Sequence, residues 1–137
     1  MDLKLPLFLT AAGTLLLLAA GPAAAASQQN ARQEIATAAA HAGMAANAAD
    51  LTMVHAHLHH VINCLVGPHG AAYDATQEDP CKGQGAGAIP DTTSAGTKKN
   101  LEAALAIART GARDTSMTTA KEKAEQVQSR LTSALGK

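Results

Sequence analysis

The chain has 137 residues, a formal net charge of zero from 11 basic and 11 acidic residues, and six histidines. Hydrophobic residues make up 47% of it but aromatic residues only 1%, so the apolar content is mainly alanine and leucine, which favours closely packed helices over a β-sheet. This length allows one domain. A neutral chain with so few aromatic side chains offers neither the positive surface nor the stacking groups of a nucleic-acid-binding protein.

Residues 1–26 have the pattern of a secretory signal peptide. One lysine precedes a leucine-rich run, and Gly21-Pro22 interrupts this run before the alanines that end at Ala26. We predict cleavage after Ala26, which leaves residues 27–137 as one helical domain without a membrane anchor, in the periplasm or secreted. The alternative is a retained anchor, since the apolar run nearly reaches the length of a membrane span.

Two helices are predicted next, over residues 28–49 and 51–66. The first carries a stripe of small or aliphatic residues at steps of three and four: Ile35, Ala39, Ala42, Ala46 and Ala49. The second carries Leu51, Val54, Leu58, Val61 and Leu65 on one face. Asp50 is suited to cap the second helix, although the pattern also allows one continuous rod. Gly67-Pro68 ends the second helix.

Residues 67–97 are rich in glycine and proline and predict a long loop, which is functional or braced. A third apolar stripe follows it, made of Leu101, Leu105, Ala108 and Ala112. Asp114 is suited to cap a fourth helix, whose apolar residues are Met117, Ala120, Ala124, Val127, Leu131 and Ala134. The predicted fold is therefore all-α, a small antiparallel bundle of four helices with a long loop.

The only two cysteines are Cys64, at the end of the second predicted helix, and Cys81, inside the loop. In an oxidising compartment we expect them to form a disulfide that braces the loop. The alternative is a pair of free thiolates that bind a soft metal. The spacing is not the C-x-x-C of thioredoxin-like proteins, and no C-x-x-C-H motif is present for covalent haem.

Four of the six histidines fall within six residues of the second predicted helix: His55, His57, His59 and His60. On a helix they form two pairs, His55 with His59 and His57 with His60, on either side of the apolar stripe. Met53 and Cys64 extend the second pair. Each pair presents two imidazoles at a spacing that can chelate one metal ion.

These residues predict a site for a transition metal, with copper favoured by Met53 and Cys64 and zinc as the second choice. One helix supplies only part of a coordination shell, so His41, Met44 or His69 are the candidates to complete it. An incomplete shell releases metal readily, which fits a carrier, buffer or sensor better than a structural zinc site. No nucleophile stands in a motif with a base and no Glu-x-x-His pair is present, so we expect no enzymatic activity.

Other interpretations use the same histidines differently. His60 falls near the centre of the exposed face and is explained by solvation alone, and His55 and His57 flank the core, where histidines often satisfy backbone groups. The protein would then be a structural or adaptor protein with a protein partner that the sequence does not identify. A third interpretation is a stress protein that responds to pH, because four imidazoles gain charge on mild acidification.

Two segments carry a resemblance to other proteins. They are His57-Leu-His-His-Val-Ile-Asn-Cys-Leu-Val-Gly-Pro68 and the stretch from Asp79-Pro-Cys-Lys-Gly-Gln-Gly85 to Gly87-Ala-Ile-Pro-Asp91. The pattern resembles small exported bacterial proteins to which no activity is assigned, and it covers about a third of the chain. The resemblance implies that the second helix and the braced loop form one unit.

Overall fold

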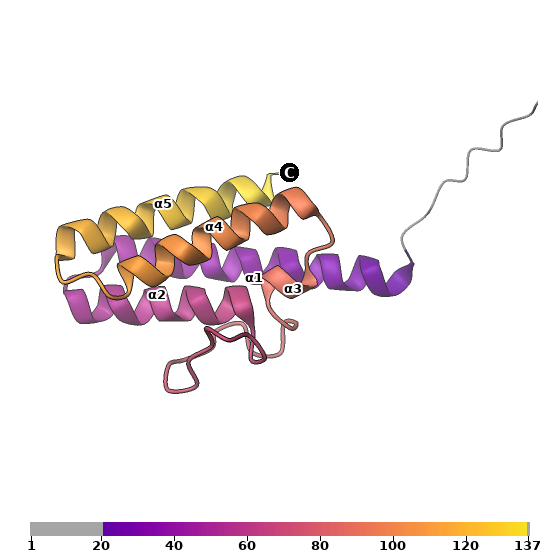
Figure 1. The fold of residues 1–137 in the computed structure, drawn as a ribbon, viewed down its shortest axis with the longest axis horizontal. Coiled ribbons are helices and arrows are strands. Elements are labelled where there is room, and N and C mark those ends of the chain that lie inside the picture. Colours follow the sequence, from indigo (N-terminus) through magenta and orange to yellow (C-terminus); the bar gives the residue numbers. More distant parts are fainter. Residues whose placement is uncertain (1–20, 137) are drawn as a thin grey trace, which may run out of the picture.

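The computed structural model describes residues 21–136, which form five helices and no strand. The helices are α1 (Pro22–Asn47), α2 (Leu51–Val66), α3 (Ala88–Asp91), α4 (Ala95–Gly111) and α5 (Met117–Leu135). The four long helices lie side by side, and the segment between α2 and α3 protrudes from one side of them (Figure 1). The prediction of an all-α fold is confirmed.

The boundary between α1 and α2 follows from the residues at the junction. The α1 helix ends at Asn47, and Ala48 then adopts extended backbone with ψ of 147°. The Asp50 carboxylate accepts a hydrogen bond from the Met53 backbone N–H at 2.8 Å, which satisfies a donor that has no partner within the helix. The predicted cap is confirmed, and the two helices are separate rather than one rod.

The core lies along the predicted apolar stripes. Alanines supply most of the α1 contribution, and their small side chains let the neighbouring helices approach closely. The largest side chains in the core come from the other helices and from Ile35, which is 1% exposed. Leu58, Leu65, Leu101, Val127 and Leu131 are fully buried. Of the predicted stripe residues, Ala49 is exposed because it lies beyond the end of α1.

The prediction that Asp114 caps the last helix is wrong by two residues. The cap is Ser116, whose hydroxyl oxygen accepts a hydrogen bond from Thr119 N–H at 3.4 Å. Asp114 instead orders the preceding turn, since its Oδ1 accepts hydrogen bonds from Ser116 N–H at 3.2 Å and from the Thr119 hydroxyl at 3.0 Å. The Lys123 ammonium, with these donors, lowers the pKa of Asp114 to about 2.

The predicted loop over residues 67–97 is not irregular throughout, because α3 forms within it and α4 already begins at Ala95. Cys64 and Cys81 form the predicted disulfide, with their Cα atoms 5.1 Å apart. The fully buried Asn63 adds three hydrogen bonds: its amide nitrogen donates to the Asp74 and Glu78 carbonyls, and its oxygen accepts from Asp74 N–H. The loop is therefore fastened to the last turns of α2.

At Gly67 the backbone that leaves α2 passes close to the backbone of Ala86, just before α3. The φ of 66° at Gly67 lies in the left-handed region, and a Cβ atom there would lie 1.7 Å from the Ala86 carbonyl oxygen. Only glycine allows the chain to leave α2 and pass this close to the segment that returns into α3.

The buried Glu34 side chain forms a hydrogen bond between α1 and the residue that precedes α3. It is 1% exposed, and its Oε1 accepts a hydrogen bond from Gly87 N–H at 2.8 Å, while Oε2 has no partner among the described residues. Burial raises the pKa of Glu34 to about 7, with Asp91 and Asp79 adding to the rise and the Gly87 N–H opposing it. The carboxyl group is therefore protonated in mild acid.

The pH dependence of stability should change in Glu34→Gln. The folded-state pKa of Glu34 lies above its ordinary value of 4.5, so the folded protein binds more protons between these values and becomes less stable as the pH rises through this interval. Glutamine cannot ionise. We therefore expect the variant to become more stable relative to the wild type as the pH rises from 5 to 8. Urea unfolding at each pH measures this difference in unfolding free energy. A constant difference would contradict this.

Within residues 21–136, none of the helices has both the length and the hydropathy that crossing a membrane requires. The predicted signal peptide lies mostly outside the described residues, since the structure describes only its last six, of which Pro22–Ala26 belong to α1.

Candidate metal centre

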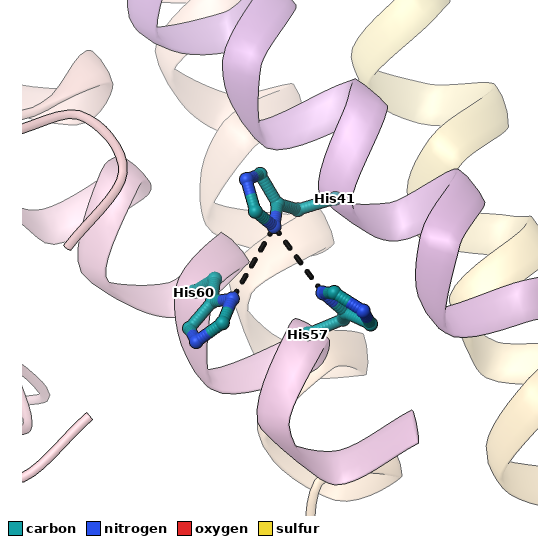
Figure 2. A group of neighbouring side chains, drawn as sticks. All are labelled: His41, His57 and His60. Atoms are coloured by element: carbon teal, nitrogen blue, oxygen red, sulfur yellow. Dashed lines mark hydrogen bonds between the residues drawn. The ribbon is translucent and has the colours of Figure 1, made fainter. Parts of the chain in front are cut away.

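Three histidines from two helices meet at one point between α1 and α2. His41 extends from α1 toward α2, and His57 and His60, three residues apart, extend from one side of α2 toward it (Figure 2). His60 is 8% exposed and the other two are half-buried. The ring centroids lie 5.1–5.5 Å apart in all three pairs.

The ring nitrogens have the separations of a metal-binding set. Nδ1 of His41 lies 3.3 Å from Nδ1 of His57 and 3.3 Å from Nδ1 of His60. One ligand nitrogen from each ring lies within 4.8 Å of the other two. A tetrahedral ion with metal–nitrogen bonds of about 2.0–2.1 Å holds its ligand nitrogens about 3.3 Å apart. Two of the three separations therefore match this geometry without rearrangement.

The contacts between these ring nitrogens are better suited to a bound cation than to hydrogen bonds. Nδ1 of His41 faces two other Nδ1 atoms, and a neutral imidazole nitrogen either donates one hydrogen or offers one in-plane lone pair. It cannot satisfy both neighbours with well-aligned hydrogen bonds. A metal ion accepts the lone pairs of all three nitrogens at once, which removes the mismatch.

The surroundings favour the neutral form of two of these imidazoles. Burial, followed by the His60 and His57 rings, lowers the pKa of His41, and burial followed by His57 lowers the pKa of His60. The Glu78 carboxylate opposes the shift in both cases. Since only the neutral ring offers a lone pair, lowered pKa values make these ligands available to metal at neutral pH.

The structure brings together only part of the predicted ligand set. His57 and His60 lie in the group, and His41 completes it. His55 points away, with Nε2 at 2.8 Å from the Asp114 carbonyl oxygen, and His59 lies with Nδ1 at 3.9 Å from the Asp74 carboxylate.

Of the sulfur-containing candidates, Cys64 is held in the disulfide, and Met53 and Met44 are 43% and 49% exposed. His69, the other candidate to complete the shell, lines a separate cavity of about 470 Å³ beside Val66 and Leu105. The three ligands that the structure brings together are all imidazoles.

His60 does not lie on a solvent-exposed face, so its interpretation as a solvated residue is wrong. The position of a residue on an isolated helix gives its angle to the apolar stripe, but not which neighbouring helix covers that side. Here α1 covers it, and the His41 ring packs against His60 at nearly a right angle, 81°. His41 itself gave no spacing signal, because it precedes His57 by 16 residues on another helix.

A comparison with protein-family models, with curated proteins and with solved structures finds no match for this chain.

Proposed function

We propose that this protein is an exported metal-binding protein that takes up one transition-metal ion at His41, His57 and His60. The observation that carries the proposal is the convergence of three imidazole nitrogens from two helices, with separations of 3.3 Å from His41 to each of the others. Export is supported by the signal-peptide pattern of residues 1–26 and by a disulfide, which is typical of oxidising compartments.

The scaffold of this site is proposed to be an antiparallel four-helix bundle. Contacts between α1 and α2, α2 and α4, α4 and α5, and α5 and α1 close a ring of neighbours. Short turns join α1 to α2 and α4 to α5, as expected for adjacent helices that run in opposite directions. A site between α1 and α2 then lies at one edge of the bundle.

Copper is the favoured metal and zinc the second choice. Cys64, which favoured copper in the sequence, is held in the disulfide, so the preference depends mainly on the general order of affinities, in which copper(II) exceeds zinc at nitrogen ligands. Three protein ligands leave a coordination position for water or for a ligand from another molecule. At this open position the metal can be passed to a ligand of another molecule, which fits a carrier, buffer or sensor.

Metal affinity should depend on pH in a defined direction. Protons compete with metal for each imidazole, and the lowered pKa values of His41 and His60 move this competition toward lower pH. We expect the zinc affinity to change little between pH 7 and 8 and to fall steeply below about pH 6. Competition titrations with a chromophoric chelator at each pH measure this. Unchanged affinity at pH 5 would exclude imidazole ligands.

A pH-responsive protein without metal is the second candidate, favoured by the same close contacts. Protonation of all three rings would place like charges 3.3 Å apart and push α1 from α2. The two candidates differ in one result. Saturable binding of one equivalent of metal at pH 7.5 supports the first, whereas no binding together with loosening of the helices near pH 5 supports the second.

A further inference from the structure

A second group of potential metal ligands lies around the disulfide. Sγ of Cys64, Sγ of Cys81 and a carboxylate oxygen of Asp79 all lie within 4.8 Å of one another. Cys64 is fully buried, Cys81 is 4% exposed and Asp79 is half-buried. In the oxidised protein the sulfurs are bonded to each other and this group binds nothing.

We propose that reduction by a small dithiol converts this group into a second metal site, in which the Cys64 and Cys81 thiolates and the Asp79 carboxylate bind a soft or borderline divalent ion of the zinc and cadmium class. This inference uses none of the three histidines and is independent of the function proposed above.

Contacts that do not involve the sulfur–sulfur bond hold these residues in place. Asp79 Oδ1 accepts a hydrogen bond from Cys81 N–H at 3.0 Å, and its Oδ2 accepts one from the Tyr73 hydroxyl at 3.3 Å. Asn63, next to Cys64 on α2, binds the Glu78 carbonyl at 3.1 Å. The segment carrying Asp79 and Cys81 therefore stays against α2 when the disulfide is opened.

The dithiol is the only reductant that opening the disulfide requires. The dithiol gives two electrons and two protons, closes to its own cyclic disulfide, and leaves Cys64 and Cys81 as thiols. The Glu34 carbonyl oxygen lies 3.8 Å from Cys81 Sγ, a position that suits a thiol hydrogen and disfavours a bare thiolate. A divalent ion then displaces the two thiol protons, and its charge compensates the buried thiolates.

Thiolates and one carboxylate form a softer ligand set than three imidazoles, so the two sites should differ in metal preference. Cys64 follows His60 by four residues on α2, which places the reduced site about one helical turn from the histidine group. A metal held by the thiolates would therefore lie beside the first site, on the side of the braced loop.

Cadmium titration of the full mature protein, with and without a dithiol, tests this inference. Thiolate-to-cadmium charge-transfer absorption should be absent in the oxidised protein and should saturate at one equivalent in the reduced protein. The same absorption should persist in reduced His41→Ala/His57→Ala, which distinguishes this site from the histidine site. Asp79→Asn should weaken cadmium binding by about tenfold, whereas the control Glu78→Gln should not.

Three results would overturn the inference. The first is the absence of charge-transfer absorption in the reduced protein. The second is an affinity that Asp79→Asn leaves unchanged, which would mean that the thiolates bind without the proposed third ligand. The third is loss of the helical circular dichroism on reduction, because the proposal requires the site to exist in the folded chain.

Discussion

Replacing His41 and His57 by alanine together should abolish metal binding at neutral pH. The double variant keeps one imidazole of the three, and a single histidine does not chelate, so we expect the zinc or copper(II) affinity to fall by more than about 100-fold. Isothermal titration of metal into the wild-type protein and the variant measures the change. The bound metal should decrease from near one equivalent to none.

The matched control is His55→Ala/His59→Ala. It also removes two half-buried histidines, one turn apart on α2, but both side chains point away from the group, toward the Asp114 carbonyl and the Asp74 carboxylate. Its metal affinity should stay within about threefold of wild type. Equal losses in the two double variants would show that the metal binds to histidines in general rather than at the centre between α1 and α2.

Cys64→Ser/Cys81→Ser should have the largest effect on stability. The disulfide joins residues 17 apart, and closing a loop of that size restricts the unfolded chain by about 3 kcal/mol. We expect the free energy of unfolding in urea to fall by this amount in the metal-free protein. Since domains of this size are commonly stable by about 5–15 kcal/mol, the variant should still fold.

The hydrogen bonds of Asn63 act on the folded loop and are separate from the effect of the cross-link on the unfolded chain. A loss of less than about 1 kcal/mol in the double serine variant would contradict the expected contribution of the cross-link. Asn63→Ala would then be the more damaging change, because it leaves the buried backbone groups of Asp74 and Glu78 without partners. Comparing the two variants in the same urea series separates the contribution of the cross-link from that of the amide.

Local signals predicted the parts of the fold that depend on neighbouring residues. The bounds of α2, its cap at Asp50 and its end at Gly67 follow from capping chemistry and from the apolar stripe that includes Leu58. The pairing of Cys64 with Cys81 follows from there being only two cysteines in the chain, for which we predict an oxidising compartment. The cap of α5 could not be predicted in this way, because Asp114 and Ser116 are both suitable capping residues.

The composition of the candidate site depends on packing between helices, which periodicity does not encode. His57 and His60 could be placed on one side of α2, but the helix that covers them, and hence the choice of His41 as the third ligand, depends on how α1 and α2 rotate against each other. The alanines of α1 allow this close approach without specifying it.

X-ray absorption spectroscopy of the oxidised protein loaded with one equivalent of zinc tests whether His41, His57 and His60 bind the metal together. We expect three imidazole nitrogens at about 2.0–2.1 Å, one further light ligand and no sulfur, with the imidazole signal lost in His41→Ala/His57→Ala. A shell that contains sulfur at about 2.3 Å, or one with a single imidazole, would contradict a metal centre formed by His41, His57 and His60.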